Sequence, residues 1–158
     1  MLFRSMTAIG QGNTLVTPME MALVTSAVAN RGVMMTPYYV DRVDTYDGDK
    51  VKQNKPSQYK EVMTAKEAAI LSDFMMKTVE SGTASALSGT EYTVAGKTGS
   101  AEYEMNADEK GTHSWFVGFS DVNNPDIVVS VIAEDGGTGS TVAVPIAKTI
   151  FDTYYYGY

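Results

Sequence analysis

Ala95-Gly96-Lys97-Thr98-Gly99-Ser100 is the stretch of sequence that decides the fold. It overlaps a β-rich run, Tyr92–Thr98, and two further β-rich runs follow it, Trp115–Phe119 and Ile127–Ala133. Asn123–Asp126 is typical of a turn between the last two, and the acidic stretch Glu102–Lys110 is typical of a solvated loop between the first two. Strands joined by short links pair antiparallel, and helical patterns flank these three. The sequence therefore predicts an α+β fold around a three-stranded antiparallel sheet.

Gly96-Lys97-Thr98 also invites a nucleotide-binding interpretation. A phosphate-binding loop requires Gly-x-x-x-x-Gly-Lys-Ser/Thr, and its first glycine would fall at Glu91. The lysine of such a loop opens a helix, whereas Gly99 follows Thr98 directly and no helical pattern begins there. The sequence therefore favours a strand over a phosphate-binding loop.

On a strand, Lys97 and Gly99 lie on one face and Thr98 on the other. At a twisted edge, a cation and a hydroxyl can still approach one cleft, where they would suit a carboxylate. Gly99 lets a ligand lie against the strand and pair with its backbone. A surface lysine on an edge strand is the alternative, and the tripeptide alone favours it.

Three helices are predicted around the sheet. Thr17-Pro18-Met19-Glu20 is a capping box with proline at the first helical position, and the apolar run Met19–Ala29 predicts a helix buried on most faces. Thr64-Ala65-Lys66-Glu67 starts a second helix, which ends at Ser81-Gly82. A third closes the chain, with its apolar face running from Val142 to Tyr154.

The segment between the first two helices predicts a β-hairpin. Asp47-Gly48 is a strong hairpin signal between Tyr38–Tyr46 and a return strand at Lys50–Gln53. The polar, proline-bearing stretch Asn54–Lys60 reads as a connector.

Composition excludes several function classes. The 158 residues carry 12 basic and 19 acidic side chains, a net charge of −7, which works against nucleic-acid binding. Without cysteine there is no disulfide framework or thiolate zinc site, and the single histidine, His113, makes a histidine-rich metal site implausible. We expect no cofactor and no metal, and no stretch of the chain is apolar enough to span a membrane. We expect His113, just before a strand, to be a packing or loop residue.

Segments along the whole sequence, together with Lys97-Thr98-Gly99, resemble those of one known family. In chain order they are Ile9–Gly12, Val16–Ala22, Ala29–Gly32, Thr36–Tyr38, Val79–Ala84, Ala95–Glu102, Ser114–Phe119 and Ala143–Pro145. As a set they resemble the C-terminal part of the transpeptidase domain of class B penicillin-binding proteins, a fold shared with serine β-lactamases. The resemblance implies that residues 1–158 are one segment of such a domain.

The family fold is a five-stranded antiparallel sheet with helices on both faces. The family chemistry is acyl transfer on D-Ala-D-Ala stem peptides, and β-lactams imitate that substrate. The resemblance assigns substrate-carboxylate recognition to Lys97 and Thr98, the active-site strand to Gly99, and an oxyanion-hole N–H to Ser100, which stands where threonine is commoner. It implies stem peptides and β-lactams as partners, and a location on the extracytoplasmic face of the cell membrane through an anchor outside this chain.

The other two motifs of the family have no convincing match in this sequence. The nucleophile motif Ser-x-x-Lys occurs here only as Ser57-Gln58-Tyr59-Lys60, in the polar connector after Pro56, and we interpret it as chance. Ser-x-Asn has no match. We therefore expect the nucleophile to lie in an N-terminal part of the same domain, and this chain alone to be inactive. A non-catalytic β-lactam-sensing domain and a plain structural or interaction domain are the alternatives.

Overall fold

The structure is a computed structural model that describes residue 10 and residues 14–104 and 110–157. Ile9, Gln11 and Gly12 of the family-like segment lie outside the described residues, as does the centre of the predicted Glu102–Lys110 loop. The elements in chain order are α2 (Pro18–Ala29), β1 (Val33–Met35), β2 (Arg42–Asp44), β3 (Lys50–Gln53), β4 (Gln58–Glu61), α3 (Ala65–Glu80), the 3-10 turn η1 (Ser85–Leu87), β5 (Ala95–Glu104), β6 (Lys110–Ser120), β7 (Ile127–Ala133) and α4 (Ala143–Tyr156).

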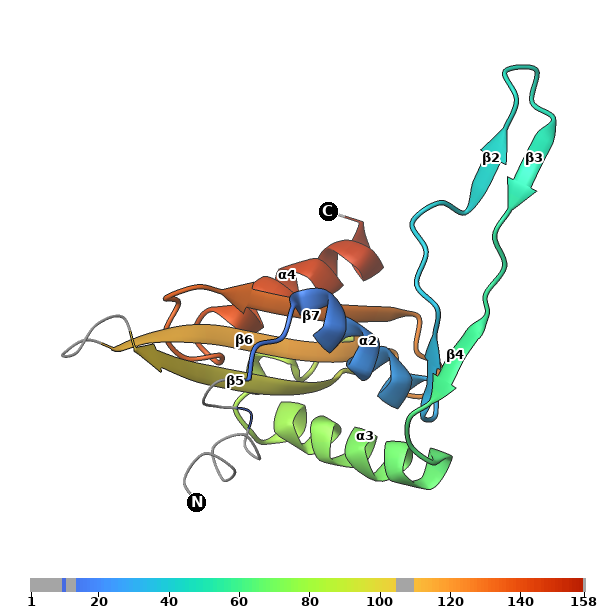
Figure 1. The fold of residues 1–158 in the computed structure, drawn as a ribbon. Helices are drawn as coiled ribbons and strands as arrows, with labels where there is room; N and C mark the ends of the chain where they lie inside the picture. The colour runs from blue at the N-terminus through green and yellow to red at the C-terminus, as the bar shows by residue number, and fades with distance from the viewer. Residues whose placement is uncertain (1–9, 11–13, 105–109, 158) are drawn as a thin grey trace.

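The central sheet has the order β5-β6-β7, and both pairs are antiparallel (Figure 1). Thr98 pairs with Phe116, and Phe116 pairs in turn with Val131. The predicted sheet and the bounds of its third strand are confirmed. Among the described residues β5 has one neighbouring strand, so its outer edge is open there.

The first two strands differ from their predicted bounds. β5 begins at Ala95 rather than Tyr92, because the Thr93 hydroxyl bonds to Asp121 and accepts the Val122 N–H, outside the ladder. β5 then continues to Glu104, which pairs with Lys110 at the start of β6. Both ends of the predicted Glu102–Lys110 loop are therefore strand.

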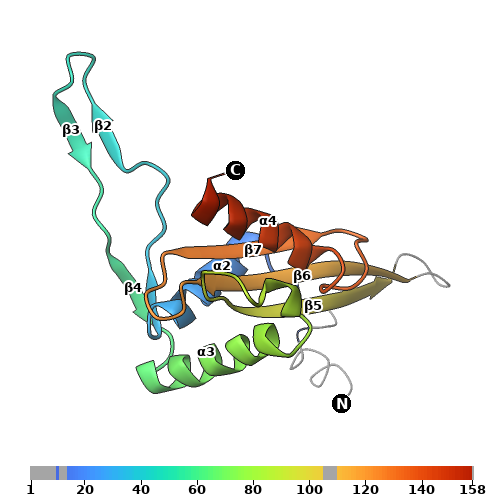
Figure 2. The same cartoon turned by 180° about the vertical axis from the view of Figure 1, so that it is seen from behind.

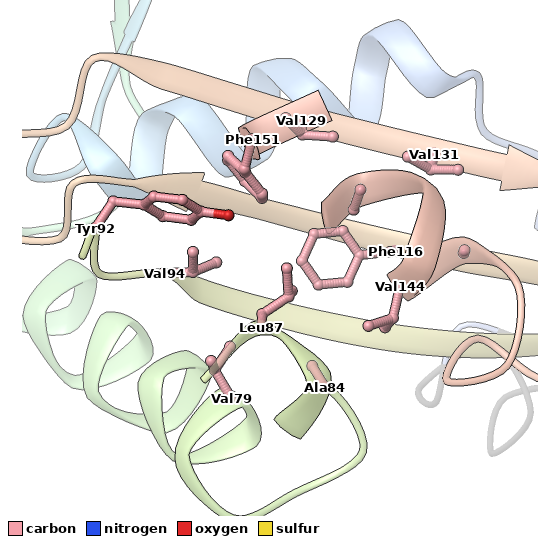
Figure 3. Packing of buried hydrophobic residues seen from close by; sticks show 12 residues of the cluster. Val79, Ala84, Leu87, Tyr92, Val94, Phe116, Val129, Val131, Val144 and Phe151 are labelled. Atoms are coloured by element: carbon pink, nitrogen blue, oxygen red, sulfur yellow. The ribbon is translucent and has the colours of Figure 1, made fainter. Parts of the chain in front are cut away.

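The core lies on both faces of this sheet. On one face Phe116 packs with Val144 and Phe151 of α4 (Figure 3). On the other face Phe119 packs with Val28 of α2. Because Phe116 and Phe119 are three residues apart on β6, they point to opposite faces. The sheet is therefore the middle of three layers, and Figure 2 shows α4 on the side away from α2.

Both predicted capping boxes are present. Thr17 accepts the Glu20 N–H at 3.2 Å and Thr64 accepts the Glu67 N–H at 3.3 Å, while each glutamate accepts its threonine's backbone N–H at 2.8 Å. Each glutamate carboxylate also accepts a hydrogen bond from its threonine's hydroxyl, and the two bonds that the carboxylate accepts lower the pKa of Glu20 and of Glu67. The predicted positions of the two helix starts are confirmed.

The expectation that the first helix is buried on most faces is wrong. Only Thr25, Ala27 and Val28 of α2 are buried. Met19 and Val24 are 40% and 45% exposed, because α2 presents one face to the sheet and no described element covers the other.

The predicted hairpin is confirmed as β2–β3, an arm that projects away from the sheet (Figure 1), with the return strand as predicted and the first strand limited to Arg42–Asp44 of the predicted Tyr38–Tyr46. The predicted connector is partly strand, because Gln58–Glu61 forms β4 and pairs with β1 at the base of the arm. All residues of β2, β3 and β4 are exposed. Among the residues that the structure describes, no helix has the length and apolarity needed to cross a membrane.

Candidate active-site wall

Lys97 lies on the open edge strand and is exposed. Its ammonium group donates a hydrogen bond to the backbone oxygen of the adjacent Thr98. Its side chain borders a groove of about 360 Å³ between α2 and α3, next to Val117 of β6. The predicted alternation holds, since Lys97 belongs to the α2 and α3 face of the sheet and Thr98 to the opposite one.

This groove is apolar apart from two threonines and one charge. Its lining residues are Met21, Val24, Thr25, Val28, Leu71, Phe74, Met75, Thr78, Lys97 and Val117. Phe74 is 59% exposed. The groove is therefore apolar and has a single cation, which lies on strand β5.

Thr98 is tied to a turn far away in sequence. Its hydroxyl lies 2.6 Å from that of Thr83, and either oxygen can donate the hydrogen bond. Thr83 follows Gly82, where a Cβ would come within 2.8 Å of the Thr78 carbonyl oxygen. The Val79–Ala84 motif therefore places a hydroxyl beside Thr98, a contact that sequence reasoning missed although it had singled out both segments.

The glycine-rich turn after β7 packs against strand β5. The Gly139 N–H donates to the Ser100 hydroxyl at 3.3 Å. A Cβ on Gly139 would lie 2.7 Å from the Gly99 carbonyl oxygen and 2.6 Å from that of Trp115. Only a glycine fits this closely over the strand. In the sequence, the glycines at and after Gly136 were the one sign that this turn could approach another backbone so closely.

A buried serine fixes the same turn to the sheet. Ser114 of β6 is fully buried, and its hydroxyl donates to the Thr138 carbonyl oxygen at 2.8 Å and accepts the Ala143 N–H at 3.1 Å. The residue before α4, Val142, provides no side-chain cap. Ser114 therefore caps α4 from the neighbouring strand and holds the turn that touches Ser100.

Replacing Ser114 with alanine is expected to lower the free energy of unfolding by about 1–3 kcal/mol, because the Ala143 N–H and the Thr138 carbonyl lose their partner in a buried place. Urea titration of the full-length protein measures this change. Ser88→Ala, at an exposed hydroxyl, is the control and should stay within about 0.5 kcal/mol of the parent. Equal stability of the two variants would show that the Ser114 bonds add nothing.

The sequence predicts His113 just before a strand, but the residue lies within β6, because this strand starts earlier than predicted. Its ring stacks on Tyr103 at a centroid distance of 4.3 Å, and its Nδ1 accepts the Asp135 N–H at 3.3 Å. The hydrogen bond that the Tyr103 hydroxyl donates to the Asp135 carboxylate raises the pKa of Tyr103. These contacts give His113 the packing role that the sequence predicts.

Ser57 and Lys60 have no geometry for nucleophile activation. Lys60 belongs to β4 and pairs with Met34 of β1, and Ser57 immediately precedes that strand. Residues three apart in extended chain point to opposite faces, whereas a serine and its base must lie within hydrogen-bond reach. Across residues 10, 14–104 and 110–157, no three histidine, aspartate or glutamate side chains converge as a metal site.

Comparison with known proteins identifies the family. The penicillin-binding protein transpeptidase domain matches residues 2–152. The peptidoglycan D,D-transpeptidase PbpA of Mycolicibacterium smegmatis is 32% identical over 152 residues, covering 90% of this chain and 30% of the relative. The peptidoglycan D,D-transpeptidase MrdA of Haemophilus influenzae is 30% identical, covering 92% of this chain and 25% of the relative.

Solved structures agree with the sequence matches. Penicillin-binding protein A from M. tuberculosis, in a ceftriaxone acyl-enzyme complex, superposes with a TM-score of 0.88 at 26% identity, over 95% of this chain and 35% of that one. The D,D-transpeptidase domain of a peptidoglycan glycosyltransferase from Eggerthella lenta gives 0.78 at 34% identity, over 90% of this chain and 33% of that one. The chain spans about a third or less of each of these proteins. By sequence and by fold, it belongs to the penicillin-binding protein transpeptidase family.

Proposed function

We propose that this chain is the C-terminal part of the transpeptidase domain of a class B enzyme that cross-links peptidoglycan stem peptides by serine acyl transfer. The observation that carries the proposal is the placement of Lys97: an exposed ammonium group on an open edge strand, at the rim of an apolar groove. An extended peptide can pair with such an edge while its terminal carboxylate meets the cation.

The proposed chemistry assigns one role to each residue of the strand. Lys97 and the Thr98 hydroxyl bind the carboxylate of the terminal D-alanine, and Gly99 leaves room for the peptide. The Ser100 N–H stabilises the oxyanion that forms when the catalytic serine attacks the preceding carbonyl, a contribution of about 3–4 kcal/mol where such donors have been removed. D-Alanine leaves, and an amine of a neighbouring stem then takes the acyl group from the serine.

The nucleophile comes, in this proposal, from an N-terminal part of the same domain. The apolar side chains in the groove between α2 and α3 would pack against that part, which would also cover Val24 and Phe74. Burying such side chains stabilises an interface by about 25 cal/mol per Å² of apolar area. A nucleophile-bearing element seated in this groove would lie next to Lys97, as the chemistry requires.

The proposed setting is the outer face of the cell membrane, where stem peptides and β-lactams are accessible. The net charge of −7 disfavours direct adsorption to anionic lipid. Attachment at that face would therefore require a hydrophobic anchor rather than electrostatic adsorption.

Penicillin labelling tests the proposed function. The full-length protein is expected to form a covalent adduct with a fluorescent penicillin and to transfer an acyl group from a D-Ala-D-Ala peptide to an acceptor amine. Labelling without transfer would favour the β-lactam-sensing alternative. Absence of both would contradict the proposal.

The isolated chain of residues 1–158 is expected to form no adduct under the same conditions, because its one Ser-x-x-Lys match, Ser57–Lys60, does not hold the lysine within reach of the serine. Intact-mass spectrometry followed by peptide mapping measures this directly. An adduct at Ser57 would show that Ser57-Gln58-Tyr59-Lys60 is the nucleophile motif after all.

A further inference from the structure

The hydroxyl of Thr83 occupies the place next to the carboxylate-binding hydroxyl of the active-site strand. The two oxygens are 2.6 Å apart, although the residues are 15 positions apart in sequence. A distance of 2.6 Å is at the short end for hydroxyl pairs, so this bond is well formed.

The turn that carries Thr83 is fixed by backbone contacts. The Gly82 and Ala84 N–H groups both donate to the Thr78 carbonyl oxygen, each at 3.1 Å, so the end of α3 folds over on itself. Ala84 is fully buried in the core that includes Leu87. The turn that carries Thr83 is therefore fixed to the core by the following residue, Ala84.

When an anion binds to Thr98, the number of available protons decides which of the two hydroxyls donates the hydrogen bond between them. A threonine hydroxyl has one proton to donate and lone pairs that accept. If Thr98 donates its proton to a carboxylate, it can only accept from Thr83. The Thr83 proton then completes a chain of two hydrogen bonds that run towards the negative charge, and such chains strengthen each member.

We propose that Thr83 is a positioning residue that donates to the Thr98 hydroxyl and thereby directs the Thr98 proton to the carboxylate of the substrate or β-lactam. This role rests on the proposed function, because it requires a carboxylate bound at Lys97 and Thr98. Thr83 itself acts through Thr98.

The test is a comparison of two ligands that differ only in the carboxylate. In the full-length protein, Thr83→Val is expected to lower the second-order rate of acylation by benzylpenicillin about three- to tenfold, the value of one neutral hydrogen bond. Acylation by the methyl ester of benzylpenicillin should change less than twofold, because the ester has no negative charge to attract the Thr98 proton. Thr83→Ser keeps the hydroxyl and should restore the rate with the free acid.

Two further variants distinguish positioning from general damage. Ser88→Ala, at an exposed hydroxyl directly after η1, should leave both rates unchanged. Adding Thr83→Val to Thr98→Val should cost much less than Thr83→Val alone, because residues that act through one another are not additive.

Three outcomes would overturn the role of Thr83: equal losses with acid and ester, no loss with the acid, or full additivity with Thr98→Val. If Thr83→Val does not fold, Thr83→Ala also removes the hydroxyl and takes its place in the comparison of acid with ester and in the cycle with Thr98→Val. Failure of the unsubstituted protein to react with benzylpenicillin is a different result, because it would overturn the proposed function itself.

Discussion

Lys97→Ala in the full-length protein is expected to slow acylation by benzylpenicillin by a factor of about thirty to several thousand. The estimate comes from the loss of a cation opposite a partly desolvated carboxylate, about 2–5 kcal/mol, at about 1.4 kcal/mol for each tenfold change in rate. Stopped-flow or gel-based labelling at several penicillin concentrations measures the second-order rate. Because Lys97 is exposed, the melting temperature should stay close to that of the parent.

Two variants test whether the charge or its shape matters. Lys97→Arg should recover only part of the rate, since a planar guanidinium does not replace a compact ammonium group. Lys66→Ala removes an exposed lysine from the first turn of α3 and should leave the rate unchanged. A parent-like rate in Lys97→Ala would remove this lysine from the site, and a lost rate together with a much lower melting temperature would make it structural.

The elements that could be predicted from the sequence are those that depend on residues close together in the chain. The capping boxes at Thr17 and Thr64 and the Asp47-Gly48 turn were all confirmed, because each depends on residues within about four positions. The strand Ile127–Ala133 was confirmed to the residue. Its β-branched run is bounded by clear turn residues, so neither end was ambiguous.

Features that depend on tertiary contacts could not be predicted in the same way. β5 starts at Ala95 because Thr93 bonds to the turn after β6, a partner 28 residues away. The exposed face of α2 follows from which elements cover it, and helix periodicity carries no such information. Strand β4 lies in a polar stretch and exists through its pairing with β1.

In the candidate site too, some residues could be predicted from local sequence and others could not. Lys97, Thr98, Gly99 and Ser100 were chosen from the sequence, and their roles stay predictions that the experiments above test. The neighbours that support them were missed, because Thr83 and Gly139 reach the strand only after the chain has folded. Motif reasoning finds residues that touch a ligand, whereas the contacts that hold those residues in place require the three-dimensional structure.

Gly139→Ala is expected to reduce the acylation rate of the full-length protein by about a hundredfold, a typical cost of misplacing a reacting group by about 1 Å. The new Cβ would lie 2.6 Å from the Trp115 carbonyl oxygen and 2.7 Å from that of Gly99, so backbone must move. The turn cannot simply lift away, because Ser114 holds Thr138 and Ala143 on either side of it. Part of the shift therefore falls on the strand that carries the Ser100 N–H.

The control for Gly139→Ala is Gly48→Ala at the tip of the arm. Gly48 has φ of +89° and no atom within 4 Å of a Cβ, so alanine there strains the backbone but touches nothing. Its cost, about 1 kcal/mol, should appear in stability and leave the acylation rate unchanged. If Gly139→Ala lowers the melting temperature and keeps the parent rate, the turn has absorbed the movement, and the position of the Ser100 N–H does not depend on Gly139.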